Sequence, residues 1–391
     1  MTESALTHIL KDNFEKYQVM WNDRRFHTHT SHHLGSLALL GADDELLKDI
    51  YAKVSCRFSK EYELSPHEIN DDNWRDSLGE KKFCLAYRDY FIDKLPKDDD
   101  NWKAKLFEIL LDDSQGLPLI DGIFCGLFHS LIHVDYALEL NDRLVACEAL
   151  TLTVVNADET FQKFVHQLKS PINETKQPIE ILKEIYADIN APKDIEQNDS
   201  SFISLYYNQW KVPDCVNEII EQLFDMSVYL YGATHKPDQV DFSFVFIHLI
   251  TGANAIRKIQ SNFDEIILRK LLHVFFYLTL KFYIAQQQPL INEQLIDNYE
   301  VENEKLNWKY VIDKILNTKL AAELHVPKIV RALRDAEQDY GSKNQFYLKT
   351  AIKTVDNLNV DIEWDYYKSV EPWIGMPHSE RQLNLKHNFS I

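Results

Sequence analysis

The sequence is poor in the residues that interrupt regular structure. Only 10 glycines and 12 prolines occur among 391 residues, too few for the regularly spaced turns of an all-β sandwich or barrel. Apolar residues recur instead with helical periodicity. The helical stretches are residues 34–54, 103–111, 122–140, 216–231, 242–259, 263–287, 308–320 and 326–340. One β-branched run, residues 149–155, is compatible with a short strand. We predict an all-α fold with few strands.

Cysteine is rare as well, and its spacing excludes two common uses. Cys56, Cys84, Cys125, Cys147 and Cys215 are odd in number, widely spaced and free of any C-x-x-C pair, so neither a disulfide framework nor a cysteine zinc site is indicated. The first 18 residues lack the basic start and apolar stretch of a signal peptide. We predict a cytoplasmic protein with reduced thiols.

Long apolar runs and excess positive charge are both missing. The most apolar stretch, residues 271–285, is interrupted by His273 and Lys281 and is shorter than the roughly 20 residues of a membrane span. With 42 basic against 61 acidic side chains the net charge is −19, which repels nucleic acid and anionic membrane surfaces. We predict that neither is a partner.

The chain is long enough for one large helical domain or two smaller ones, and we predict a single domain over residues 1–391. Residues 170–201 are polar and contain a helix-like stretch, and we expect a surface excursion there. Residues 357–391 are aromatic but aperiodic. We expect them to wrap over the body as a C-terminal tail.

Several common catalytic motifs do not occur. Neither nucleotide-binding loop, G-x-G-x-x-G or G-x-x-x-x-G-K-[ST], is present, so NAD(P)H as a cofactor has no support. H-E-x-x-H and G-x-S-x-G are missing too, which argues against zincin proteases and α/β-hydrolases. The paired E-x-x-H motifs of ferritin-like di-iron proteins are also missing.

Histidine, in contrast, is abundant, with 15 copies, and two clusters have helical spacing. His29 and His32 are three residues apart at the start of a predicted helix, and His129 and His133 are four apart within an apolar one. Both spacings place two imidazoles on one helix face. Solvent-exposed histidines in the first cluster, and core histidines bonded to backbone carbonyls in the second, are the alternatives.

Two further segments carry single histidines. His248 lies in an apolar helix, as does His273, and either is compatible with a core role. His325 and Lys328 are one turn apart, around Pro327, which suits a first helical turn. The Lys328 side chain starts on an apolar surface, so it either extends to water or has a perturbed pKa. A deprotonated Lys328 can act as a base or accept carbon dioxide.

Together these segments resemble the questin oxidase family, and four family motifs match in order. The N-H-x-P-H motif and its following L-G-A are matched by Thr28, His29, Ser31 and His32, then Leu40, Gly41 and Ala42. The G-x-x-H-P-L-I-H motif and its tail are matched by Gly126, His129, Ser130, Leu131, Ile132 and His133, then Tyr136, Ala137 and Glu139. The last two motifs are matched by His248, Thr251 and Gly252, and by His325, Lys328, Arg331 and Ala332. Serine replaces both signature prolines, and Thr28 replaces the asparagine.

The resemblance implies a helical oxidoreductase of secondary metabolism that uses dioxygen to oxidise or open the ring of an anthraquinone-like aromatic substrate. It also implies one non-haem Fe(II) ion, bound by one histidine from each motif and by Lys328 as a carboxylated ligand. The expected ligands are His32, His133, His248, His325 and Lys328, with His29 and His129 as alternates or outer groups. Lys328 and Tyr136 are the expected catalytic residues.

Two other functions stay open at this point. A metal-free helical protein that binds an apolar ligand would explain the buried histidines as core residues. A hydrolase with two ions bridged by a carboxylated lysine would need more carboxylates near the histidines than these motifs offer. Histidine-rich sites accept iron, zinc and manganese alike, so the metal itself is an expectation from the resemblance.

Overall fold

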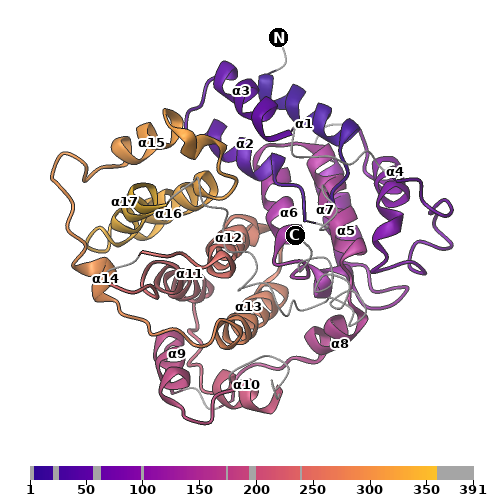
Figure 1. Cartoon of the computed structure of the whole chain (residues 1–391). Helices are drawn as coiled ribbons and strands as arrows, with labels where there is room; N and C mark the ends of the chain where they lie inside the picture. The colour runs from indigo at the N-terminus through magenta and orange to yellow at the C-terminus, as the bar shows by residue number, and fades with distance from the viewer. Residues whose placement is uncertain are drawn as a thin grey trace, which may run out of the picture. The chain divides into compact units, whose positions relative to one another are not determined.

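The computed structural model describes residues 4–20, 26–55, 63–97, 101–172, 175–192, 200–237 and 240–358, and regular structure in these ranges is helical (Figure 1). They contain 17 α-helices and four short 3-10 helices. Extended pairing there is limited to two isolated bridges, Met20 with His27 and Lys176 with Trp210. The prediction of an all-α fold is confirmed.

The chain forms two compact units. The first runs to Gln167 and the second begins at Leu168. Helices of the first unit are α1 Ala5–Lys16, α2 Thr30–Leu39, α3 Asp44–Ser55, α4 Cys84–Lys94, α5 Asn101–Leu111, α6 His129–Glu139, α7 Arg143–Val155 and α8 Glu159–Gln167. Those of the second are α9 Pro178–Ala187, α10 Ser200–Tyr207, α11 Val216–Gly232, α12 Phe244–Ile259, α13 Glu265–Ala285, α14 Gln294–Asp297, α15 Trp308–Leu316, α16 Val326–Tyr340 and α17 Phe346–Asn357. The 3-10 helices are η1 Lys81–Phe83, η2 Leu119–Gly122, η3 Gln260–Asn262 and η4 Lys319–Ala322.

Helix α7 is the centre of the first unit and corrects one expectation. Its residues are buried from Val145 to Val155, and it packs on α1, α4, α5 and α6. The β-branched run 149–155 therefore lies in a helix, not a strand. The Asp142 side chain caps this helix by accepting from the backbone N–H groups of Leu144 and Val145 at 2.8 and 3.2 Å. Capping together with burial on every side outweighs the β propensity of the run.

Two predicted helices of the first unit are interrupted. The stretch 34–54 divides into α2 and α3 because Gly41 adopts a left-handed φ of +99°, which lets the Ala42 N–H reach the Leu37 carbonyl at 2.9 Å and end α2. The stretch 122–140 is α-helical only from His129 onward, as α6, because residues 126–128 form a left-handed turn. Both breaks fix where a histidine-bearing helix begins or ends.

In the second unit, α11 and α12 pack together, and each also contacts α13 and another long helix (Figure 1). The predicted stretches 216–231, 242–259, 263–287 and 326–340 correspond to α11, α12, α13 and α16. Within the described ranges, none of the helices has both the length and the apolar character that crossing a bilayer requires. The apolar stretch 271–285 is accordingly a buried part of α13.

Two predicted segments are only partly described. The polar segment 170–201 contains α9, while residues 173–174 and 193–199 lie outside the described ranges. The predicted C-terminal tail lies outside them from residue 359 onward. The expectation of a single domain stays a prediction.

Candidate metal centre

Helices α2 and α6 of the first unit bring two histidine pairs together. His29 Nε2 lies 3.2 Å from His129 Nε2, and His32 Nε2 lies 2.7 Å from His133 Nδ1. Ser36 Oγ and Tyr136 OH continue the series at 2.5 Å. Residues three or four apart share a helix face, so each pair lies on one face, and the packing of α2 on α6 brings the two pairs together.

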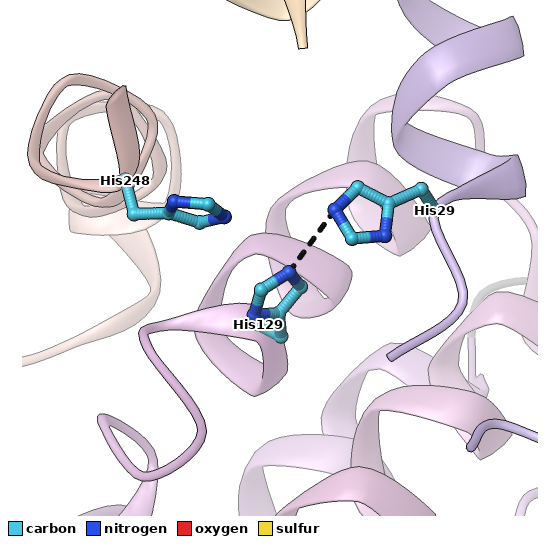
Figure 2. Close-up of side chains that lie close together, drawn as sticks. All are labelled: His29, His129 and His248. Carbon is cyan, nitrogen blue, oxygen red and sulfur yellow. Dashed lines mark hydrogen bonds between the residues drawn. The ribbon is translucent and has the colours of Figure 1, made fainter. Parts of the chain in front are cut away.

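The hydrogen bonds of His29 and His129 fix which nitrogen carries the proton. His29 Nδ1 lies 2.7 Å from the His27 carbonyl oxygen, and His129 Nδ1 lies 2.6 Å from the Gly126 carbonyl oxygen. A carbonyl oxygen only accepts, so both Nδ1 atoms are donors. In the neutral rings both Nε2 atoms are then acceptors that face each other (Figure 2).

This arrangement suits a shared cation. Two facing lone pairs repel unless a proton or a positive ion lies between them. Two imidazole nitrogens bound to one first-row metal ion at about 2.1 Å lie about 3.0–3.4 Å apart, and the observed separation of His29 and His129 is 3.2 Å. Backbone carbonyls that hold Nδ1–H groups are also the usual outer partners of metal-binding histidines. The donor set therefore fits a metal ion.

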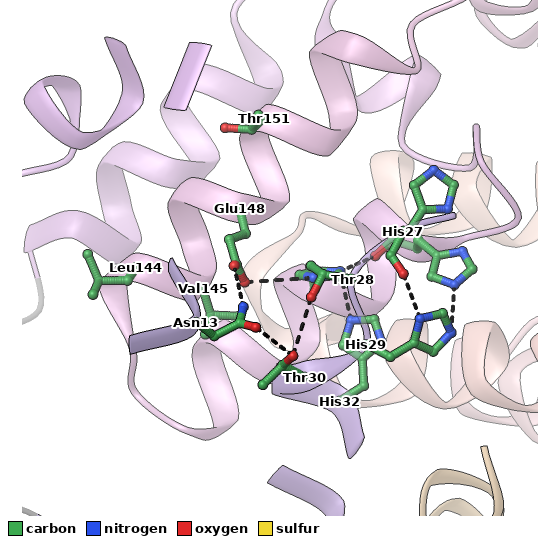
Figure 3. A network of polar contacts seen from close by, with 12 residues as sticks. Asn13, His27, Thr28, His29, Thr30, His32, Leu144, Val145, Glu148 and Thr151 are labelled. Carbon is green, nitrogen blue, oxygen red and sulfur yellow. Dashed lines mark hydrogen bonds and ion pairs between the residues drawn. The ribbon is translucent and has the colours of Figure 1, made fainter. Parts of the chain in front are cut away.

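The second pair, His32 and His133, is connected to a buried carboxyl group instead. Glu148 Oε2 lies 3.9 Å from His133 Nε2, and Glu148 Oε1 accepts from Asn13 Nδ2 at 3.2 Å. Asn13 Oδ1 in turn accepts from the Thr30 hydroxyl at 2.7 Å (Figure 3). Burial raises the pKa of Glu148 to about 8. These contacts connect α6 and α2 to Glu148 of α7 and Asn13 of α1.

A left-handed turn places the Gly126 carbonyl within hydrogen-bond distance of His129 Nδ1. Gly126, Leu127 and Phe128 have φ values of 67°, 54° and 66°, and each non-glycine residue in this conformation costs about 1–2 kcal/mol. Burial of the Leu127 and Phe128 side chains stabilises the turn. Strain held by packing in this way is common at functional sites.

Gly126→Ala is expected to lower the free energy of unfolding by roughly 2 kcal/mol or more. Part of the loss is the left-handed conformation, and part is steric, because a Cβ at residue 126 would lie 2.8 Å from His27 Cε1. Urea unfolding measures the total. Gly41→Ala is the control, because Gly41 is also left-handed but a Cβ added to it would have nothing within 4 Å. Equal losses in the two variants would contradict the steric part.

The second unit orients His248 and His325 in the same way. His248 Nδ1 lies 2.8 Å from the Phe244 carbonyl oxygen, and His325 Nδ1 lies 3.0 Å from Glu323 Oε1. Glu323 Oε2 also accepts from the backbone N–H groups of His325 and Val326, at 2.7 and 2.6 Å. The ring centroids of His248 and His325 are 5.4 Å apart. Burial, followed by the nearby charge of Lys328, lowers the pKa of His325. Figure 2 shows the His248 ring extending from α12.

Lys328 lies in the first turn of α16 with only 2% of its surface exposed. Among the described residues, none accepts a hydrogen bond from its Nζ, which is uncommon for a buried polar group. Burial lowers the pKa of Lys328 to about 7. Its amine is therefore substantially neutral near physiological pH, and a neutral amine is a base and a nucleophile.

The predicted site residues thus fall into two groups. His29, His32, His129 and His133 meet in the first unit, and His248, His325 and Lys328 belong to the second. Tyr136 is buried, with its ring centroid 5.3 Å from that of His32. The two carboxylates that lie beside the histidines, Glu148 and Glu323, were not among the predicted residues. A lone glutamate, Glu148, within an apolar run was the available signal, since such residues are rarely buried without a purpose.

Comparison with known proteins bears on the same segments. A family model described as questin oxidase-like matches residues 26–333, which include all four histidine motifs. The questin oxidase of Aspergillus terreus is 19% identical over 363 residues, covering 85% of this chain and 80% of that protein. The oxidoreductase AflY of Aspergillus parasiticus is 22% identical over 417 residues, covering 97% of this chain and 82% of that protein.

These matches confirm that the chain is an enzyme of the oxidoreductase class. The family match alone spans well over half of the chain, and both relatives are aligned over most of their own length. The chain therefore belongs to the questin oxidase-like family.

Proposed function

We propose that the chain is an iron-dependent oxidoreductase that uses dioxygen to oxidise, and open, a ring of an aromatic polyketide such as an anthraquinone. The observation that carries the metal part is the pair of facing Nε2 atoms of His29 and His129, 3.2 Å apart with both Nδ1 atoms bonded to carbonyls. The names of the two fungal relatives support the reaction class, and the name of the Aspergillus terreus relative, a questin oxidase, supports the substrate class.

The proposed ligands in the first unit are His29 and His129. His32 and His133 bond to each other at 2.7 Å, and they are assigned a supporting role together with Glu148. This choice within each pair differs from the one that the sequence favoured. Bound ferrous iron would supply one-electron chemistry toward dioxygen and would stabilise negative charge on a phenolate oxygen.

In the second unit, His248 and His325 are proposed ligands because Nδ1 of each bonds to an oxygen. His133 Nδ1 also lies 2.9 Å from a carbonyl oxygen, that of His129, but its shorter contact is with His32 Nε2 at 2.7 Å. Lys328 is proposed to react with carbon dioxide. The neutral amine attacks the carbon, an N–C bond forms, and one amine proton leaves to solvent. The product is a carbamate anion, whose oxygen can offset the charge of a metal ion. Without that reaction, the neutral amine can act as a base.

Elemental analysis of protein purified without a histidine tag tests the metal. We expect the purified protein to contain iron, and to take up oxygen on addition of an anthraquinone or its reduced form. When isotope-labelled dioxygen is supplied, the label should appear in the ring-opened product. Protein that takes up no metal, even after anaerobic reconstitution with ferrous iron, would contradict the proposal and favour a metal-free protein that binds an apolar ligand.

Removal of bicarbonate is expected to lower the activity, and its return to restore it, if Lys328 is carboxylated. Carbon NMR with labelled bicarbonate should then show one carbamate signal that Lys328→Met eliminates. Lys353→Met is the control, since Lys353 is buried too but its Nζ donates to the carbonyls of Gly232 and Leu295 at 2.9 and 2.8 Å. A signal that survives Lys328→Met would contradict the assignment.

A further inference from the structure

His27 lies outside the proposed ligand set but contacts both ligands of the first unit. Its carbonyl oxygen accepts from His29 Nδ1 at 2.7 Å. Its ring lies against the ring of His129, with centroids 4.5 Å apart and planes tilted by 36°. The backbone around it is fixed, because the Thr28 N–H donates to the Val19 carbonyl at 2.8 Å. One residue therefore touches both imidazoles that face each other.

The ring of His27 is itself held by Asn156, the C-cap of α7. Asn156 Nδ2 lies 3.0 Å from His27 Nε2 and 2.9 Å from the Leu152 carbonyl oxygen, while Asn156 Oδ1 lies 3.3 Å from the same ring nitrogen. The Leu152 carbonyl fixes the orientation of the amide, and the shorter contact, from the Nδ2 donor, makes His27 Nε2 an acceptor. The ring is thereby held in one orientation beside the ring of His129.

Gly126 provides the space for this ring. A Cβ at residue 126 would lie 2.8 Å from Cε1 and 2.9 Å from Nε2 of His27, and 3.1 Å from Asn156 Nδ2. The carbonyl of the same glycine accepts from His129 Nδ1 at 2.6 Å. The glycine thus lets His27 approach while it fixes the proton of His129.

We propose that His27, held by Asn156, is a positioning residue that aligns His29 and His129 so that their Nε2 atoms converge on one ion. This inference rests on the proposed metal-binding function. His27 acts on His29 through its backbone carbonyl and on His129 through its ring. Simple filling of the core would instead need only the volume of the ring, and Phe would replace it without loss.

The test compares His27→Ala, His27→Phe and Asn156→Leu with the wild-type chain. Ferrous iron affinity, measured by competition with a chelator, is expected to fall about 10-fold to 100-fold in His27→Ala and Asn156→Leu, as for other outer partners of metal ligands. His27→Phe keeps an aromatic ring but removes one of the two acceptors of Asn156 Nδ2, so the ring is no longer held and the iron affinity should fall too. His67→Ala, in an exposed histidine of the same unit, should bind iron as the wild type does.

A second readout does not depend on metal. In the metal-free protein with nitrogen-labelled histidine, NMR should show His29 and His129 as Nδ1–H tautomers. His27→Ala should keep the His129 tautomer, which the Gly126 carbonyl holds, but broaden the ring signals of His129, because the ring that packs against it is removed. Unchanged affinity and unchanged ring signals of His129 in the variants would overturn the inference. If the wild type binds no iron, the proposed function fails, and the His129 ring signals alone decide: broadening in His27→Ala supports the positioning role and unchanged signals overturn it.

Discussion

The iron affinity of His129→Ala is expected to be more than 100-fold lower than that of the wild type, and the variant should show no measurable oxygen uptake. The variant removes an Nε2 that faces His29 Nε2 at 3.2 Å. His133→Ala should lose only about 10-fold to 100-fold, the range typical of outer partners. His133 Nδ1 lies 2.7 Å from His32 and 2.9 Å from the His129 carbonyl, so its removal disturbs the orientation of α6 without removing a ligand.

The comparison is made on the metal content and chelator-competition affinity of folded protein. Circular dichroism should show the same helical content in both variants, because each removes one side chain from the same helix. His29→Ala and His32→Ala repeat the test on α2, where His29 is expected to show the larger loss. A larger loss in His133→Ala and His32→Ala would reverse the assignment and restore the choice of ligands that the sequence favoured.

The fold was predictable wherever a helix is defined by local signals. Helix α16 has the predicted bounds, Val326–Tyr340, because Pro327 suits its first turn and Gly341 follows its last. The left-handed turn before α6 was not predictable. Leu127 and Phe128 have no intrinsic preference for positive φ, and only burial within the unit holds them there.

The site was predictable as a set of spacings but not as a set of atoms. Helical spacing placed His29 with His32 and His129 with His133, and the two pairs do meet. Which member of a pair is presented to a metal depends on contacts that spacing does not contain. His129 is oriented by the carbonyl at the end of the left-handed turn, and His133 lies near Glu148 from α7. Such partners come from separate helices and need the folded chain.

Lys328→Met is expected to abolish activity while raising the free energy of unfolding by roughly 1–4 kcal/mol at pH 7. Lys328 is buried, and none of the described residues accepts from its Nζ, so the folded state bears the desolvation of an amine without a hydrogen bond to offset it. Replacement of buried polar groups by apolar side chains of similar shape stabilises proteins by amounts of this order. A stabilising loss-of-function variant indicates that the lysine is kept for chemistry.

Lys353→Met should do the opposite and destabilise the chain by about 1–3 kcal/mol, because it leaves the Gly232 and Leu295 carbonyls without their donor. Both lysines are buried in the second unit. The unfolding free energies of the two variants therefore distinguish an amine that stabilises the fold from one that does not. If Lys328→Met were as destabilising as Lys353→Met, Lys328 would have a structural partner, and a role in chemistry would no longer be needed to explain its burial.

The advantage of Lys328→Met should also depend on pH in metal-free, bicarbonate-free protein. The pKa of Lys328 is about 7 in the folded chain, against an ordinary value of 10.5. Between these values the unfolded chain binds more protons than the folded one, so wild-type stability rises with pH, by at most about 1.4 kcal/mol per unit. The methionine variant lacks this contribution. The difference between the two proteins should therefore be largest near pH 7 and shrink toward pH 10.5, as urea unfolding across that range would show. A constant difference would mean that Lys328 keeps its ordinary pKa, and a neutral amine at physiological pH would no longer explain its reactivity toward carbon dioxide.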